Sequence, residues 1–370
     1  MSAKFNERLA SIPGYTPGVP KGHTAEDVAG SDLAQLASNE SPHPPLPAVA
    51  AAIAEASNSM NRYPDPDATR LRAALAERHG VDPAGIAVSN GSCEILLAAG
   101  DAMLEPGADV VYAWPAFSIY PTLAAKAGSG EIRVPLAEGE VHDLEAMLGA
   151  ITPETRLVLV CNPNNPTATY VPSAAVADFV RRVPEDVTVI LDEAYIEFQC
   201  VDDPAASVDL LERHDNLVVL RTFSKSHSLA GLRVGYSLSS PEFRAAVDAV
   251  RQPFSVNALA QAAATEALAH GDAVAEQIAA QIAERERVEA GLAEIGLDTA
   301  DTAANFSWIS LGGRGADIEG AVVADLEAAG IVVRPGKLLG APGRLRISYG
   351  NREENDRMLA ALADSVRRNS

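Results

Sequence analysis

Residues 217–235 read LVVLRTFSKSHSLAGLRVG, and the rest of the chain can be organised around this segment. Its first four residues are apolar and rich in β-branched side chains, which predicts a short buried strand. A polar turn follows that contains Thr222, Ser224 and Lys225, and after it come small residues and Arg233. The segment therefore predicts one lysine just beyond a strand end, with two hydroxyls before it and an arginine after it.

A lysine at the end of a buried strand can lose part of its hydration, which lowers its pKa and makes the neutral amine available. A neutral amine can form a Schiff base with an aldehyde, and hydroxyl and guanidinium groups can hold a phosphate. A lysine beside a phosphate site suggests pyridoxal phosphate as the ligand. The alternative is that Lys225 is a solvated lysine in a turn, and this segment alone does not decide between the two.

The composition bounds the class of protein. The chain has 370 residues, of which 47% are hydrophobic, enough for a folded protein with two domains and a large core. Its net charge of −21, from 29 basic and 50 acidic residues, argues against a nucleic-acid partner or an anionic membrane surface. A strongly negative protein that binds anionic ligands has to gather its arginines locally.

Targeting and redox features point to the cytoplasm. The three cysteines, Cys93, Cys161 and Cys200, are far apart and form no CxxC pair, which fits a reducing compartment. The first residues show no basic segment followed by an apolar one, so we expect no signal peptide. No apolar run approaches the roughly 18 residues that a membrane helix needs.

Strand-like and helix-like segments alternate between residues 80 and 240, which predicts a mostly parallel sheet with helices on both faces. Ligands of such sheets bind beyond the carboxyl ends of the strands. Asn165, Asp192 and Lys225 each follow a predicted strand closely. The three strands are expected at residues 157–160, 187–191 and 217–220. We therefore expect these three side chains to converge.

Other segments allow both a functional and a structural interpretation. A Gly-Ser turn at Ser92 leads into a helix near Cys93, which is either a phosphate cradle or an ordinary helix cap. Phe117 follows a strand and either stacks on a planar ring or packs in the core. Arg334 and Arg346 lie among β-branched residues, so each needs a carboxylate or a ligand anion as partner.

Four motifs together resemble the fold-type I PLP-dependent aminotransferases, and within them the histidinol-phosphate aminotransferase subfamily. These motifs are CNPNNPT at 161–167, LDEAYIEF at 191–198, RTFSKSHSLAGLRVGY at 221–236 and RLRIS at 344–348. The resemblance runs from Tyr15 to the C-terminal helix. It implies an α/β, three-layer PLP-transferase fold with a mostly parallel sheet in the large domain and a smaller α+β domain. The expected parts are an N-terminal arm joining the small domain (1–45), a large PLP-binding domain (46–260) and a small C-terminal domain (261–370).

The resemblance also implies roles around the ring of the cofactor, pyridoxal 5'-phosphate. Lys225 would form the Schiff base and then move a proton during catalysis. Asp192 would pair with the pyridine nitrogen, which makes the ring a better electron sink. Tyr195 and Asn165 would hydrogen-bond the 3′ oxygen, and Phe117 would stack on the ring face.

Phosphate and substrate contacts follow from the same resemblance. The cofactor phosphate would be held by Ser92, Cys93, Thr222, Ser224 and Arg233. The resemblance also implies a homodimer with shared active sites, in which Tyr63 of the neighbouring subunit would reach the same phosphate. The substrate would be bound by Tyr15, Asn39, Arg334 and Arg346, with Arg346 on the carboxylate. No metal is expected.

Some positions depart from the family pattern and leave substrate preference open. Cys93 stands where an acid is frequent, Ala168 replaces a glycine, and His227 and His43 replace aromatic residues. The expected reaction is transamination between histidinol phosphate and 2-oxoglutarate, giving imidazole acetol phosphate and glutamate. Transamination of aromatic amino acids is the alternative. Decarboxylation of a phosphorylated amino acid is a further possibility on the same skeleton, and a catalytically silent binding protein is disfavoured by the intact Lys225 and Asp192.

Overall fold

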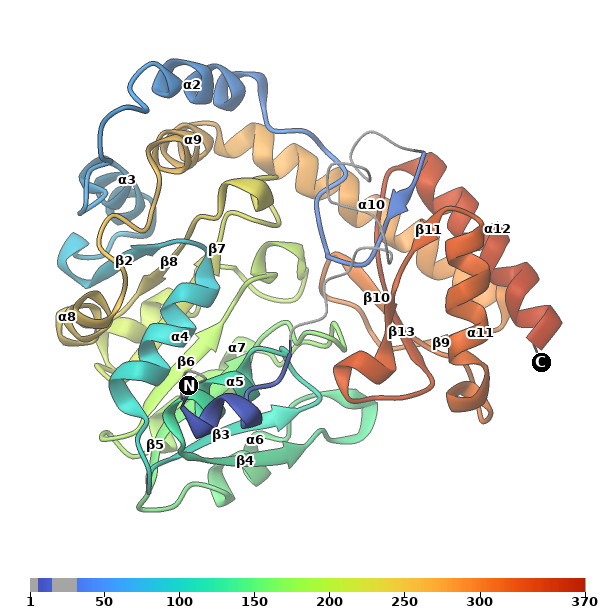
Figure 1. Cartoon of the computed structure of the whole chain (residues 1–370), viewed down its shortest axis with the longest axis horizontal. Helices are drawn as coiled ribbons and strands as arrows, with labels where there is room; N and C mark the ends of the chain where they lie inside the picture. The colour runs from blue at the N-terminus through green and yellow to red at the C-terminus, as the bar shows by residue number, and fades with distance from the viewer. Residues whose placement is uncertain (1–5, 15–31, 370) are drawn as a thin grey trace, which may run out of the picture.

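The computed structural model describes residues 6–14 and 32–369, and its largest element is a seven-stranded sheet with the order β2-β8-β7-β6-β5-β3-β4 (Figure 1). In this sheet β8 runs antiparallel to both of its neighbours, and the other neighbouring strands are parallel. The strands are β2 (Ile86–Ser89), β3 (Asp109–Trp114), β4 (Gly130–Pro135), β5 (Thr155–Cys161), β6 (Thr188–Asp192), β7 (Leu217–Thr222) and β8 (Gly235–Leu238). The predicted mostly parallel sheet is confirmed.

The central strands are apolar along their whole length because helices cover both faces of the sheet. One core cluster contains residues of α3, α6, α7 and α9, and the other contains residues of α4, α5 and α8. The helices are α2 (Pro47–Ser57), α3 (Thr69–His79), α4 (Ser92–Met103), α5 (Tyr120–Ala127), α6 (Leu144–Gly149), α7 (Ser173–Arg182), α8 (Pro241–Val250) and α9 (Ala258–Ala269). Gly80 ends α3 in the left-handed conformation, as its position after the last apolar residue predicts.

The C-terminal part has its own antiparallel sheet, with the order β12-β13-β10-β9, and its own core cluster. It consists of α10 (Gly271–Ile295), β9 (Asp298–Thr299), β10 (Phe306–Ser310), α11 (Gly315–Ala328), β11 (Ile331–Val332), β12 (Arg334–Pro335), β13 (Arg344–Ser348) and α12 (Arg352–Asn369). The N-terminal strand β1 (Ala34–Gln35) pairs in parallel with β11. The predicted domain boundaries at residues 45 and 260 stay predictions.

Two predicted elements differ from the structure. The composition from about residue 258 onward predicts one long helix, but the structure divides it into α9 and α10, because the backbone of His270 leaves the helical region at φ −112° and ψ 39° before Gly271. The sequence GIVVRPG at 330–336 predicts one strand, but the structure has two, β11 and β12. The short 3₁₀ helices are η1 (Glu7–Ser11), η2 (Pro83–Gly85), η3 (Glu138–Glu140), η4 (Ile196–Phe198), η5 (Val208–Glu212), η6 (Ala230–Leu232) and η7 (Gly336–Leu339).

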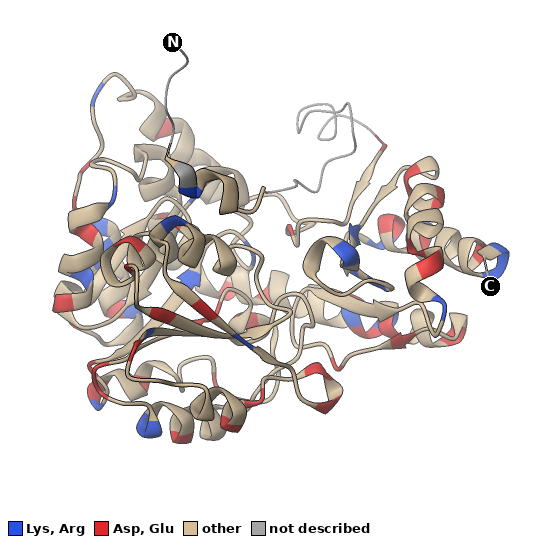
Figure 2. Ribbon diagram, turned by 60° about the horizontal axis from the view of Figure 1, so that its bottom comes forward, with Lys and Arg blue, Asp and Glu red and all other residues tan. Residues whose placement is uncertain are grey.

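Charged residues are concentrated on the outer elements. Figure 2 shows acidic residues on the peripheral helices of both parts of the molecule. Among the described residues, no helix combines the length and hydropathy that a membrane span requires.

A buried ion pair ties the ends of β6 and β7 together. Arg221 donates two hydrogen bonds to one carboxylate oxygen of Glu193, at 2.9 and 2.8 Å, and the two side chains are 6% and 2% exposed. Glu193 directly follows the last residue of β6, and Arg221 is the next-to-last residue of β7. The pair therefore fixes the edge of the sheet at which the candidate residues lie.

Replacing Arg221 with Ala should lower the free energy of unfolding by about 3–5 kcal/mol, because Glu193 would remain as an uncompensated buried charge. The exposed Arg181–Asp178 pair provides the control, and Arg181→Ala should cost no more than about 1 kcal/mol. Urea denaturation of both variants measures the difference. Equal, small effects would contradict the structural weight given to the buried pair.

Candidate active site

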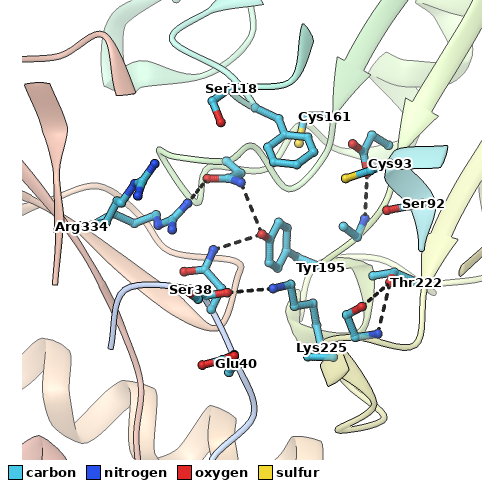
Figure 3. A pocket seen from close by; sticks show the side chains of 18 of the residues that line it. Ser38, Glu40, Ser92, Cys93, Ser118, Cys161, Tyr195, Thr222, Lys225 and Arg334 are labelled. Atoms are coloured by element: carbon cyan, nitrogen blue, oxygen red, sulfur yellow. Dashed lines mark hydrogen bonds between the residues drawn. The ribbon is translucent and has the colours of Figure 1, made fainter. Parts of the chain in front are cut away.

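A cavity of about 360 Å³ lies where β5, β6 and β7 end, and residues of β12, β13 and segment 37–40 close its other side (Figure 3). Most of the predicted site residues line it. They are Asn39, Ser92, Cys93, Phe117, Asn165, Asp192, Tyr195, Thr222, Ser224, Lys225, Arg233, Arg334 and Arg346. The convergence expected from the strand ends is therefore observed.

Among the predicted site residues that the structure describes, Tyr63 does not line this cavity. Tyr63 is 83% exposed and stacks on Phe254, with 4.7 Å between the ring centroids. Its contact with the cofactor of a neighbouring subunit stays a prediction. Tyr15 lies outside the described residues.

Lys225 extends into the cavity from the turn after β7. Its Nζ donates a hydrogen bond of 2.9 Å to the carbonyl oxygen of Ser38 and lies 6.0 Å from the ring centroid of Tyr195. Burial, with an added contribution from the positive charge of Arg346, lowers the pKa of Lys225 to about 8, although Glu40 acts in the opposite direction. The amine is therefore much more nucleophilic near neutral pH than an ordinary lysine.

Asp192 is the last residue of β6 and is only 2% exposed. Burial raises the pKa of its carboxyl group to about 6, and hydrogen bonds act against this shift. One carboxylate oxygen accepts from the hydroxyl of Tyr120 at 3.0 Å, and the other accepts from the backbone N–H of Ala194 at 3.3 Å. These bonds hold the carboxylate at the cavity in a fixed orientation.

Tyr120 was not identified from the sequence. It is fully buried, and its ring meets that of Phe117 edge to face, with 5.9 Å between centroids. It therefore touches both the carboxylate of Asp192 and the aromatic residue predicted to stack on a planar ring. Its place three residues after Phe117, at the start of α5, is the signal that would have brought it to attention.

A hydrogen-bond chain crosses the cavity from the small sheet to the large one. Arg346 donates to the side-chain oxygen of Asn165 and to the carbonyl of Ala37, each at 2.6 Å. Asn165 and Asn39 both donate to the hydroxyl of Tyr195, at 3.4 and 3.0 Å (Figure 3). The chain sets the direction of the guanidinium group of Arg346 and of the phenol of Tyr195.

The structure also explains why an asparagine stands at position 39. It has a φ of +53° and is 1% exposed, and its side chain bonds both Tyr195 and Ser348. Asparagine tolerates this left-handed conformation better than most residues. Asn39 thus ties the N-terminal segment to both sheets.

A cradle for an anion lies at the N-terminus of α4. The first N–H groups of the helix have no partner within it, and the helix dipole favours a negative charge there. A Cβ at Gly235 would come within 2.5 Å of the Ser92 nitrogen, and one at Gly91 would collide with the Arg233 guanidinium group. Glycine at these two positions therefore allows the helix end and Arg233 to lie close to the turn after β7. In that turn Ser224 accepts a hydrogen bond of 3.4 Å from Arg233.

These features fit pyridoxal phosphate. The cavity combines a reactive amine at Lys225, a buried carboxylate at Asp192, an aromatic face at Phe117 and an anion cradle between α4 and Arg233. The amine matches the aldehyde, the carboxylate matches a protonated pyridine nitrogen, and the cradle matches a phosphate. Further lining residues that the sequence did not single out for the site are Ala37, Ser38, Glu40, Ser118, Cys161, Ala194, Ala230, Gly231 and Leu339.

Comparisons with known proteins agree with this description. A model of the family described as aminotransferase class I and II matches residues 31–362. An aromatic amino acid aminotransferase from Thermobifida fusca is 46% identical over 368 residues, covering 98% of this chain and 97% of that protein. Histidinol-phosphate aminotransferase 2 from Ralstonia nicotianae is 40% identical over 369 residues, covering 99% of this chain and 98% of that protein.

The fold also matches a solved structure with bound cofactor. The crystal structure of histidinol-phosphate aminotransferase from Sinorhizobium meliloti in complex with pyridoxal-5'-phosphate has a TM-score of 0.89 and 31% identity, covering 100% of this chain and 99% of that chain. The predictions of fold class, enzyme class and cofactor are confirmed. The chain therefore belongs to the class I and II aminotransferases, a family of enzymes that use pyridoxal phosphate as cofactor.

Proposed function

We propose that this aminotransferase moves the amino group of an aromatic amino acid to 2-oxoglutarate. The observation that carries the proposal is Arg346, which is buried, anchored by Asn165 and Ala37, and directed into the cavity that contains Lys225. A guanidinium group held in this way suits a carboxylate, which every amino acid and 2-oxo acid carries. Leu339 and Phe117 add apolar surface to the same cavity.

The names of similar proteins support the aromatic donor over the one first expected. The relative from Thermobifida fusca and others from Streptomyces avermitilis and Streptomyces coelicolor, at 46%, 42% and 41% identity, are named aromatic amino acid aminotransferases. The sequence alone favoured histidinol phosphate. We now favour the aromatic donor, since the sequence identity of these relatives to the chain is at least as high as that of the relative named for histidinol phosphate.

Histidinol phosphate remains the second candidate donor, and a second arginine favours it. Arg334 lies opposite Arg346 across the β12–β13 pair, and both line the cavity. Two guanidinium groups suit a phosphate, which carries close to two negative charges. With an aromatic donor, Arg334 would instead face the second carboxylate of 2-oxoglutarate.

The residues would divide the work as follows. Bound pyridoxal phosphate supplies the electron sink that stabilises negative charge at the substrate Cα. Lys225 would bond the cofactor and, once released by the substrate, carry a proton from Cα. Asp192, oriented by Tyr120, would keep the pyridine nitrogen protonated, and Tyr195 with Asn165 would hydrogen-bond the 3′ oxygen.

The remaining contacts are proposed by analogy with the family. The phosphate would lie at the cradle of Ser92, Cys93, Thr222, Ser224 and Arg233. We further propose a cytoplasmic homodimer in which Tyr63 reaches the phosphate of the neighbouring site, since its ring is exposed and supported by Phe254. Mixed dimers of two inactive variants provide a test of that sharing.

The donor preference is tested by steady-state kinetics of the purified holoenzyme with 2-oxoglutarate. Phenylalanine or tyrosine should show a kcat/KM at least about tenfold above that of histidinol phosphate, equivalent to about 1.4 kcal/mol of transition-state binding. The reverse order would overturn the aromatic assignment and favour the second candidate.

The lowered pKa of Lys225 predicts a pH dependence for cofactor loading. The neutral fraction of an amine with a pKa of about 8 is about a tenth at pH 7 and rises towards one above pH 9. The rate at which apoenzyme gains its visible cofactor band should therefore rise through pH 8 and then level off. Lys225→Ala should lose the band and turnover, while the exposed-surface control Lys126→Ala should keep both. A Lys225→Ala protein that still transaminates would refute the assignment.

Arg346→Ala should reduce kcat/KM for amino-acid donors by roughly 30-fold or more, because a buried charge-assisted contact is worth about 2 kcal/mol or more. Arg344→Ala is the matched control, since Arg344 begins the same strand but pairs with Glu140. A donor without a carboxylate, such as phenylethylamine, should be affected much less by Arg346→Ala. Equal losses for both donors would count against carboxylate binding.

A further inference from the structure

The loop between β12 and β13, residues 336–343, is held at both ends by one buried carboxylate. Glu319 on α11 is 4% exposed, and its two oxygens accept from the backbone N–H groups of Lys337 and Gly343, at 2.9 and 2.6 Å. The backbone of Ala341 also donates to the carbonyl of Gly336 at 2.9 Å. The loop is thus closed on itself and tied to a helix.

The tip of this loop packs against Trp114, the last residue of β3. Gly340 has a φ of +87°, and a Cβ there would come within 2.6 Å of the indole of Trp114. Trp114 in turn has the guanidinium group of Arg133 over its ring at 4.6 Å. Because Trp114 ends β3 just before Phe117 and Ser118, this contact sets the loop relative to the segment that lines the cavity.

Two adjacent leucines of the loop have opposite surroundings. Leu339 is 3% exposed and lines the cavity, whereas Leu338 is 45% exposed and does not. Leu339 ends η7 in the loop between β12 and β13, the two strands that contain Arg334 and Arg346, and the proposed function assigns these arginines to the anionic groups of the substrates. Phe117, another large apolar residue that lines the cavity, is assigned to the cofactor ring.

We propose that Leu339 is a specificity-determining residue whose side chain packs against the aromatic side chain of the donor, and that Glu319 is its positioning residue. This inference rests on the proposed function and deepens it. The cavity thus offers a cationic surface, from two arginines, for the carboxylate of the donor, and an apolar surface, from Leu339, for its ring. Shortening Leu339 removes contact area for an aromatic group and leaves the anchor for the carboxylate intact.

The test compares Leu339→Ala with the control Leu338→Ala in the holoenzyme. Two inhibitors report binding alone: 3-phenylpropionate, which has one carboxylate and a phenyl ring, and glutarate, which has two carboxylates. Loss of methylene-sized contacts in an apolar pocket weakens binding by about tenfold or more. Leu339→Ala should raise the dissociation constant of 3-phenylpropionate by at least that factor and leave that of glutarate within about twofold. Leu338→Ala should change neither.

Glu319→Gln tests the two hydrogen bonds by which Glu319 holds the loop. The amide keeps the size of the side chain but presents an NH₂ group to one of the two backbone donors, so one hydrogen bond is lost. KM for phenylalanine should rise several-fold, with kcat and the affinity for pyridoxal phosphate nearly unchanged. A parallel fall in kcat and cofactor affinity would indicate a merely structural role and overturn the positioning assignment.

The identity of the donor and the role of Leu339 can be tested separately. A wild-type preference for histidinol phosphate over phenylalanine would overturn the proposed donor. A wild-type preference for phenylalanine that persists undiminished in Leu339→Ala would overturn only the role of Leu339. Equal weakening of 3-phenylpropionate and glutarate by Leu339→Ala would do the same, because it would mean a general loss of cavity shape.

Discussion

The site depends on the parallel register of three neighbouring strands. Cys161 at the end of β5 lies beside Asp192 of β6, and Asp192 lies beside Leu220 of β7. The amide of Asn165, the carboxylate of Asp192 and the amine of Lys225 follow from this register, since each is carried a few residues at most beyond its strand. A slip of one residue in β6 would turn Asp192 to the other face of the sheet, away from Asn165 and Lys225. The buried pair of Arg221 and Glu193 stabilises that register at the edge where it matters.

The sequence could predict those site features that depend only on residues close to a strand end or a helix end. Lys225 and Asp192 were identified because each follows an apolar run, and the anion cradle because a glycine turn leads into α4. Tyr120 and Asn39 were harder to interpret, because their partners are 72 and 156 residues away along the chain. Leu339 and Glu319 carry no local signal at all, because a loop residue becomes part of a cavity only when two sheets pack together. The break between α9 and α10 was missed because the composition on both sides of His270 and Gly271 is helical, so the segment resembles one continuous helix.

The charges of the protein are divided between its surface and its cavity. The chain carries a net charge of −21, yet Lys225, Arg233, Arg334 and Arg346 all line one cavity. A cavity with low-dielectric walls focuses the field of these cations, whereas the acidic residues on the outer helices are screened by salt. Anionic ligands are therefore attracted within the cavity although the molecule as a whole repels them. This arrangement suits a cofactor that carries a phosphate and substrates that carry carboxylate groups.

The burial that shifts the pKa values of Asp192 and Lys225 also lowers the stability of the fold when the cofactor is absent. Asp192 has a raised pKa, so its ionisation lowers the stability of the fold as pH rises from about 4 to about 6, and the loss is complete above that range. Lys225 has a lowered pKa, so its protonation lowers stability as pH falls from about 10 to about 8, and the loss is complete below that range. Near pH 7 the apoprotein bears both costs at once. A ligand that supplies a protonated ring nitrogen to the carboxylate and an aldehyde to the amine relieves both, which couples cofactor binding to the stability of the fold.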